Sequence, residues 1–295
     1  MRVLVTGATG FVGGNLVPAL VEVGHDVVAM TRHGSGYDPP QGVDVVEADL
    51  LEPSTLEGVF DDVDAAYYLV HSLRSGADFA ERDRRAARNF VEASRSTGLD
   101  RVVYLAGLGE TGDDLSEHLR SRREVEEVLS DGDYDLTTLR AAVIIGSESA
   151  GFRMVKQLVE RLPVMTTPAW VRTPCQPIAI SDVVEYLVGV LDAPETRGGT
   201  YEIGGPEVLS YEEMIRRTAD ALGRSPIIIR VPLLTLKLST YWVDFVTDVP
   251  RSVVHPLIHG MKNPVVVNDD TVQDYVDVEP TPFSVAVERA LSDLS

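Results

Sequence analysis

Three glycines near the start of the chain have a spacing that suits the binding of phosphate. Gly7, Gly10 and Gly13 lie in the stretch VTGATGFVGG, between an apolar run at 2–5 and a segment with helical spacing at 11–24. The first glycine permits a sharp turn, the second lets backbone approach a pyrophosphate, and the third allows close packing of helix on strand. Free N–H groups at a helix start also favour an anion. The pattern predicts a dinucleotide site, and the alternative is a glycine-rich turn that binds nothing.

The residues after the second apolar run, 26–31, indicate which dinucleotide fits. A carboxylate there would bind the ribose hydroxyls of NAD and would repel a 2′-phosphate. The sequence has Thr31, Arg32 and His33 instead, with no acid. Because a guanidinium can donate two hydrogen bonds to a phosphate, Arg32 favours NADP over NAD. The alternative is that Arg32 is an exposed arginine on a loop.

Asp49 and Leu50 end the third apolar run, 43–50. A ligand bound at the carboxyl ends of parallel strands would bring its adenine to this place. We therefore expect both residues to meet the adenine, although Asp49 could equally cap the turn before the next helix.

The elements that must hold these residues alternate between strand and helix. The expected strands are 2–5, 26–31, 43–50, 64–72, 101–107 and 135–146, and the expected helices include 11–24, 77–98 and 115–132. Such alternation predicts an α/β fold with a doubly wound parallel Rossmann sheet. We expect a Rossmann domain at 1–150 and a smaller, partly interleaved C-terminal lobe at 151–295.

Two features of the second half are informative. Ser210 precedes a helical stretch and is expected to be its N-cap. The segment 226–250 is apolar, aromatic and punctuated by proline. Its aromatic part, 233–246, could bind a hydrophobic substrate such as a quinone, or it could pack on the core or on a second subunit of a homo-oligomer.

The charge balance of the chain is strongly acidic. There are 46 acidic residues against 26 lysines and arginines, which gives a formal net charge of −20. Such a surface repels nucleic acid and anionic lipid, so neither is an expected partner. It suits a salt-rich, halophilic setting, and the alternative is a merely acidic protein. One cysteine, no apolar run long enough for a membrane span and a strand at the first residues favour a cytoplasmic protein without a signal peptide.

Several motifs resemble one superfamily. TGATGFVGG, the ADL of 48–50, YYLVHS at 67–72 and YLAGLG at 104–109 are similar to short-chain dehydrogenases/reductases. QPIAISDVVEYL and TYEIGGPEVLSYEEM narrow the resemblance to the atypical, NmrA-like and epimerase-like branch. The resemblance implies a Rossmann core whose smaller lobe closes over a nicotinamide, in an NADP(H)-binding oxidoreductase.

The same resemblance assigns residues to the parts of the cofactor. They are Gly7, Thr9, Gly10, Phe11, Val12 and Gly13 for the pyrophosphate, Arg32 for the 2′-phosphate, Asp49 and Leu50 for the adenine, Leu69, Val70 and His71 for the ribose side, and Ala106 and Gly107 for the nicotinamide end.

The sequence departs from the family at the catalytic position. Active members use a tyrosine four residues before a lysine, and here that spacing gives His118 and Arg122. In one reading His118 is the acid and Arg122 fixes the nicotinamide ribose, in a reductase of an unknown carbonyl or quinone-like substrate. In another the protein binds NADP(H) without turnover, as a redox sensor or assembly subunit. In a third both side chains lie on a solvated face. Tyr104 is a further candidate acid, although a phenol inside a strand is more often part of the core.

No other constellation in the sequence suggests chemistry. His255 and His259 have a four-residue spacing, but no third ligand is near them in the sequence, so no metal site is expected. The chain also has no G-x-S-x-G sequence of a serine hydrolase.

Overall fold

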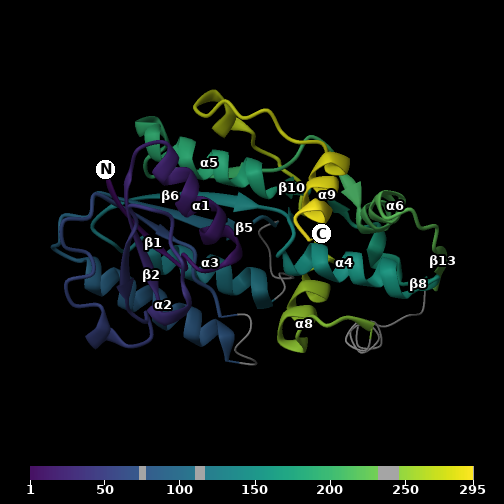
Figure 1. The fold of residues 1–295 in the computed structure, drawn as a ribbon, viewed down its shortest axis with the longest axis horizontal. Coiled ribbons are helices and arrows are strands. Elements are labelled where there is room, and N and C mark those ends of the chain that lie inside the picture. The colour runs from purple at the N-terminus through teal and green to yellow at the C-terminus, as the bar shows by residue number, and fades with distance from the viewer. Residues whose placement is uncertain (73–77, 110–116, 232–245, 295) are drawn as a thin grey trace.

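A sheet of seven parallel strands organises the structure, in the order β11-β6-β5-β4-β1-β2-β3. The computed structural model describes residues 1–72, 78–109, 117–231 and 246–294. Helices cover both faces of the sheet (Figure 1). The first-half elements are β1 (Arg2–Thr6), α1 (Phe11–Glu22), β2 (Asp26–Thr31), β3 (Asp44–Glu47), β4 (Ala65–Tyr68), α2 (Phe79–Ser94), β5 (Arg101–Gly107), α3 (Glu117–Leu129) and β6 (Asp135–Ala141). The doubly wound Rossmann fold expected from the sequence is confirmed.

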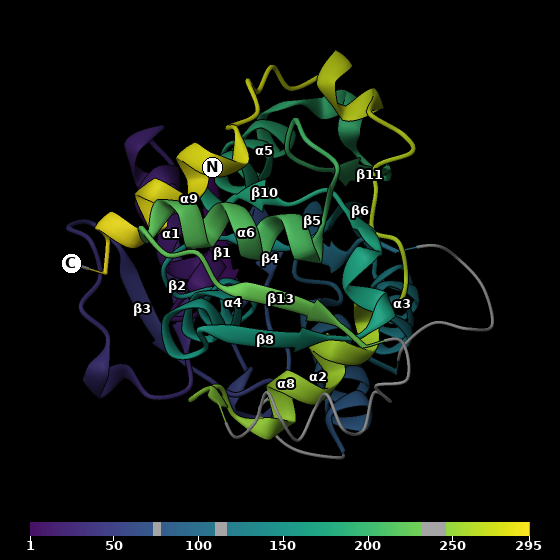
Figure 2. The ribbon, with the colours of Figure 1, turned by 90° about the vertical axis from the view of Figure 1, so that its right-hand side faces the viewer.

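The second half adds to this sheet and also builds a separate group of elements. Its strands are β7 (Ile144–Ile145), β8 (Val164–Thr167), β9 (Pro174–Cys175), β10 (Ile178–Ala179), β11 (Thr200–Ile203), β12 (Leu209–Ser210) and β13 (Ile227–Arg230). Its helices are α4 (Ala150–Arg161), α5 (Ile180–Asp192), α6 (Tyr211–Ala221), α8 (Arg251–Gly260) and α9 (Phe283–Ser292). β11 becomes the edge strand of the large sheet, whereas β8 and β13 pair with each other beside α6 (Figure 2).

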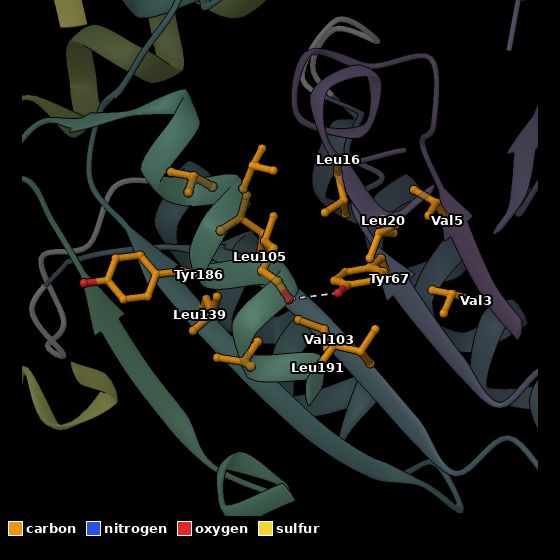
Figure 3. Packing of buried hydrophobic residues seen from close by; sticks show 14 of the residues in the cluster. Val3, Val5, Leu16, Leu20, Tyr67, Val103, Leu105, Leu139, Tyr186 and Leu191 are labelled. Atoms are coloured by element: carbon orange, nitrogen blue, oxygen red, sulfur yellow. Dashed lines mark hydrogen bonds between the residues drawn. The ribbon is translucent and has the colours of Figure 1, made fainter. Parts of the chain in front are cut away.

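One face of the sheet packs against α1 and α5. Leu16 and Leu20 are spaced by one helical turn, so both side chains meet the strands and are fully buried. Figure 3 shows them beside Tyr67 of β4, whose hydroxyl donates a 2.8 Å hydrogen bond to the carbonyl oxygen of Leu187 in α5. Val23, which the helical spacing also directs inward, is 54% exposed because α1 ends at Glu22.

The opposite face packs against α2 and α3 and is rich in aromatic rings. Phe90 of α2 makes edge-to-face contacts with Phe60 and Tyr68, at centroid distances of 5.0 and 5.2 Å. Tyr104 of β5 is fully buried in the same cluster. The sheet is therefore covered on both faces, which leaves its carboxyl edge as the place for a ligand.

Local signals in the sequence are confirmed at several element ends. Gly24 follows the C-cap of α1 and has φ of +90°, as expected of a glycine that ends a helix. The helix expected at 77–98 ends earlier, at Ser94, and Gly98, with φ of +86°, lies in the turn beyond it. Ser210 caps α6 through a capping box with Glu213. Of the apolar segment 226–250, residues 232–245 lie outside the described part of the chain. Among the described helices, none has both the length and the apolar character that crossing a membrane requires.

Candidate cofactor site

The glycine loop turns sharply from β1 into α1. Gly7 has φ of +72°, a conformation that favours glycine, and its carbonyl oxygen accepts a 2.9 Å hydrogen bond from the Gly10 N–H. Gly10 is the N-cap of α1 and has no side chain to cap the helix, and the first turn carries no acid. The first N–H groups of α1 are thus left for an external anion.

The loop also fits closely against its surroundings. A Cβ on Gly7 would lie 3.1 Å from the Leu69 carbonyl oxygen, and one on Gly13 would lie 2.3 Å from the Gly7 carbonyl oxygen. The Phe11 ring occupies the space beside Gly146, where a Cβ would lie 2.6 Å from Cζ of that ring. The residues therefore fit a pyrophosphate cradle made of backbone, with Phe11 turned toward the second half of the chain.

The reversal of strand order at β1 and β4 places this loop beside the loop that follows β4. Thr6 Oγ1 donates to the Tyr67 carbonyl oxygen at 2.9 Å and accepts from the Leu69 N–H at 3.3 Å. Leu69 and Val70 are half-buried on opposite faces of the sheet, and His71 is exposed. This is the switch point at which doubly wound sheets bind their ligands.

At the end of β2, the structure brings together one predicted residue and one that the sequence reasoning missed. Arg32 is exposed directly after the strand. Glu47 ends the neighbouring strand β3, and its Oε2 accepts a 3.0 Å hydrogen bond from the Gly34 N–H. The pairing of Thr31 with Glu47 creates this proximity. A prediction that the runs 26–31 and 43–50 pair in this register would have placed Glu47 beside the end of β2.

The two residues predicted to meet the adenine have different surroundings. Asp49 accepts from the Leu51 N–H at 2.8 Å and belongs to a turn that Thr55 closes, as the capping alternative describes. Leu50 is 3% exposed and packs in the aromatic core on the α2 face. Its side chain is thus turned away from solvent, so that an adenine contact by Leu50 would be made by its backbone.

The end of β5 supports the start of α3. Ala106 is buried and Gly107 is half-buried, and a Cβ on Gly107 would lie 3.1 Å from Cδ2 of Leu119. A Cβ on Gly109 would lie 3.0 Å from the other methyl group of Leu119. The helix therefore begins directly over the end of β5. His118 lies in its first turn, but its side chain is outside the described part of the structure.

Arg122 is half-buried and lies near Asp83 of α2. Asp83 is 4% exposed, and its Oδ1 accepts a 2.6 Å hydrogen bond from the Ser72 N–H, in the loop after β4. Burial raises the pKa of Asp83, whereas the Ser72 hydrogen bond and the Arg122 charge oppose that rise. Arg122 therefore lies near Asp83, and Asp83 binds the backbone of the loop after β4 that is predicted to contact the ribose.

Tyr104 has the environment of a core residue. Its side chain is fully buried, and its hydroxyl donates to the Arg122 carbonyl oxygen at 3.2 Å. Burial also raises the pKa of this phenol. A proton donor must reach its substrate, so Tyr104 is unsuited to that role.

A hollow of about 300 Å³ opens at the carboxyl end of β11. Gln176, which lines it, donates to the Gly205 carbonyl oxygen at 2.7 Å and accepts from the Val267 N–H at 3.0 Å. Glu202 accepts from the Asn268 N–H at 2.7 Å. The side chains of Gln176 and Glu202 therefore hold the backbone of residues 267–268 beside β11.

Curated proteins similar to this chain include reductases and a subunit of a mitochondrial NADH dehydrogenase. The chain is 24% identical over 282 residues to the mitochondrial NADH dehydrogenase [ubiquinone] 1 alpha subcomplex subunit 9 of Arabidopsis thaliana, covering 91% of this chain and 70% of that protein. It is 28% identical over 273 residues to the chloroplastic divinyl chlorophyllide a 8-vinyl-reductase of Oryza sativa, covering 84% of this chain and 65% of the reductase. It spans only 25% of several uncharacterised mycobacterial relatives.

Solved structures with the same fold cover the whole chain. A nucleoside-diphosphate-sugar epimerase from Staphylococcus aureus superposes with a TM-score of 0.79 at 16% identity, covering 98% of this chain and all of the epimerase. UDP-glucuronic acid 4-epimerase from Bacillus cereus, in complex with UDP-glucuronic acid and NAD, gives a TM-score of 0.74 at 19% identity, covering all of both chains.

The family described as NAD(P)H-binding matches residues 7–174, which begin at the first glycine of the loop and make up more than half of the chain. The protein therefore belongs to this NAD(P)H-binding family, and its fold is that of the epimerase-like, atypical short-chain dehydrogenases/reductases.

Proposed function

We propose that this protein binds NADP(H) in preference to NAD(H) and acts as an oxidoreductase on a carbonyl or quinone-like substrate. One observation carries the proposal: the sharp turn at Gly7 leads into a helix start without a side-chain cap, and Arg32 is exposed at the end of the next strand. An uncapped helix start suits a pyrophosphate, and an exposed guanidinium suits a 2′-phosphate. The proposed Rossmann domain is 1–150, and the smaller lobe, 151–295, is partly interleaved with it, because β11 returns to the large sheet.

The predicted site residues lie at several strand ends, and each group of them is proposed to contact a different part of the dinucleotide. The backbone from Gly7 to Gly13 holds the pyrophosphate, and Arg32 meets the 2′-phosphate. The loop from Leu69 to His71 supports the ribose, and Ala106 and Gly107 line the nicotinamide end. Asp49 retains a role toward the adenine through the carboxylate oxygen that its turn does not use.

The bound nicotinamide would supply or accept the hydride, and the chain would supply the proton. His118 is the proposed proton donor, because imidazole titrates near neutral pH and stands four residues before a cation. Arg122 is proposed to fix the nicotinamide ribose. Its half-buried position near Asp83, which binds the Ser72 N–H, supports that role.

A second candidate is a protein that binds NADP(H) without turning over a substrate, as a redox sensor or an assembly subunit. The similarity to the Arabidopsis subunit over 91% of this chain favours it. The absence of the Tyr-x-x-x-Lys pair from the sequence favours it as well. In that case no carbonyl or quinone would be reduced even with the cofactor tightly bound.

The experiment has two stages. A thermal-shift screen with NAD⁺, NADP⁺ and their reduced forms should show the larger stabilisation with the phosphorylated forms, since a ligand at 100 times its Kd stabilises by about 2.7 kcal/mol. Turnover is then tested on aldehydes and quinones, with the wild type and His118→Phe. A loss on the order of a hundredfold in rate with unchanged NADPH binding supports the enzyme. Tight binding without any turnover supports the second candidate, and full turnover by His118→Phe contradicts the role of His118.

The composition supports a proposal about setting. An excess of 20 acidic charges repels itself least where salt screens it, so we place the protein in the salt-rich cytoplasm of a halophile, as a monomer or homo-oligomer. Its melting temperature should then rise as KCl is increased from 0.1 to several molar. A melting temperature that falls with KCl would contradict the halophilic setting.

A further inference from the structure

The predicted 2′-phosphate site contains a carboxylate that comes from another strand. Glu47 ends β3 and is exposed, and its Oε2 lies 3.0 Å from the backbone nitrogen of Gly34, two residues after Arg32. The position opposite it on β2 is Thr31. The negative charge of Glu47 is therefore fixed beside the loop that carries the positive charge of Arg32.

The Glu47 carboxylate approaches the backbone of Gly34 closely, because position 34 has no side chain. A Cβ on Gly34 would lie 3.2 Å from Oε2 of Glu47, which is closer than ordinary contact. The carboxylate is thus held by a backbone donor, and a charge held in place acts on a ligand more strongly than a freely moving one. One of its oxygens accepts from Gly34, which leaves the other to face solvent and ligand.

The two charges act differently on the two cofactors. A 2′-phosphate is attracted by Arg32 and repelled by Glu47, because it carries up to two negative charges. The ribose of NAD has hydroxyl groups at that place instead. These neutral groups interact weakly with either charge, and they can donate hydrogen bonds to a carboxylate. A carboxylate beside this loop therefore lowers affinity for NADP without lowering affinity for NAD.

We propose that Glu47 is a specificity-determining residue that opposes Arg32 and keeps NAD(H) usable alongside NADP(H). The inference rests on the proposed NADP(H) site and adds to it the residue that limits its preference. Repulsion between Glu47 and a 2′-phosphate near the protein surface should change the ratio of the NADP and NAD affinities by roughly three- to tenfold. The Debye length is about 10 Å at 0.1 M salt and about 3 Å at 1 M, so high salt should remove most of the effect.

Two substitutions separate the charge of Glu47 from its hydrogen bond. Glu47→Gln removes the charge and keeps an oxygen that can accept from the Gly34 N–H. Glu47→Ala removes both. Asp44→Asn is the matched control, because Asp44 is an exposed carboxylate at the other end of the same strand, paired with Arg2.

The readout is the ratio of the Kd for NAD⁺ to the Kd for NADP⁺, measured by calorimetry at 0.1 M and at 1 M KCl for each variant and for Arg32→Ala. Glu47→Gln should raise this ratio roughly three- to tenfold at 0.1 M and little at 1 M, while Asp44→Asn leaves it unchanged. An unchanged or lower ratio in Glu47→Gln, with Arg32→Ala still losing its preference, overturns the role of Glu47 alone. A ratio that Arg32→Ala does not alter overturns the NADP(H) site itself and this inference with it.

Discussion

Gly13 of α1 lies directly against the backbone of Gly7: a Cβ on Gly13 would lie 2.3 Å from the Gly7 carbonyl oxygen and 2.8 Å from Cα of Ala8. Neither contact can be relieved by rotating a side chain, because both partners are backbone atoms. The helix can therefore stay where it is only while position 13 is glycine, and the turn proposed to bind phosphate depends on that position.

Gly13→Ala should displace α1 from β1 and weaken both folding and binding. Overpacking of this kind costs about 1–3 kcal/mol of unfolding free energy, and NADP⁺ binding should fall with it. Gly14→Ala is the control, since its nearest non-neighbouring atom is the Ala8 carbonyl oxygen at 4.0 Å. Because alanine is the better helix former, Gly14→Ala should be neutral or more stable by up to about 1 kcal/mol. Urea unfolding of the two variants checks this, and equal stabilities would contradict it.

Gly10→Val should separate binding from folding. Gly10 is exposed, and a Cβ there would lie 3.1 Å from the Gly7 carbonyl oxygen, so a small shift accommodates the methyl groups. Those groups would occupy the approach to the α1 N–H donors. Losing even one charge-assisted hydrogen bond, worth about 1.5–3 kcal/mol, weakens binding roughly ten- to a hundredfold. Calorimetry on a folded variant measures this, and undiminished binding would mean that the phosphate lies elsewhere.

The glycine loop and the strand alternation were predictable because their signals are local. A strand, a glycine turn and a helix start occupy residues 2–13 without help from the rest of the chain. Strand ends were less predictable. The run 43–50 forms a strand only over Asp44–Glu47, because Asp49 turns the chain by accepting from the Leu51 N–H. The pairing of β8 with β13 joins residues far apart in sequence and had no local signal.

Asp83 should matter through the hydrogen bond that it accepts from the Ser72 N–H. Asp83→Ala leaves that half-buried donor without its acceptor, which costs about 1 kcal/mol of unfolding free energy. Asp83→Asn keeps an oxygen at the same place and should cost less. Denaturant unfolding at pH 7 compares the two variants, and an asparagine variant as unstable as the alanine variant would show that the charge is needed.

The pH dependence of stability should also reveal Asp83. Because burial raises its pKa above the ordinary 3.8, the folded state binds the proton more tightly than the unfolded state. Stability of the wild type relative to Asp83→Asn should therefore fall as pH rises through 3.8 and then through the folded pKa, and level off above it. Below 3.8 both forms carry a neutral side chain and the difference should be constant. A relative stability that rises with pH would mean that Arg122 outweighs burial.

The positions of the proposed site residues were predictable where one segment supplies them and unpredictable where several meet. That Arg32 directly follows its strand needed only the sequence. Glu47 reaches Gly34 through strand pairing, and Asp83 reaches Ser72 across the loop between β4 and α2, so both contacts depend on tertiary structure. The sequence placed Arg122 four residues after His118, whereas its proximity to Asp83 follows from the packing of α3 on α2.

The central claim is that Arg32 selects NADP(H) at the glycine loop, and calorimetric titration of NADP⁺ and NAD⁺ tests it most directly. The wild type should bind NADP⁺ more tightly, and Arg32→Ala should lose roughly ten- to a hundredfold of that affinity while its NAD⁺ affinity changes little. Arg95→Ala is the control, because Arg95 is an exposed arginine at the far end of α2, near the amino edge of the sheet. Equal wild-type affinities, an Arg32→Ala variant that keeps the preference, or no saturable binding of either dinucleotide would contradict the account.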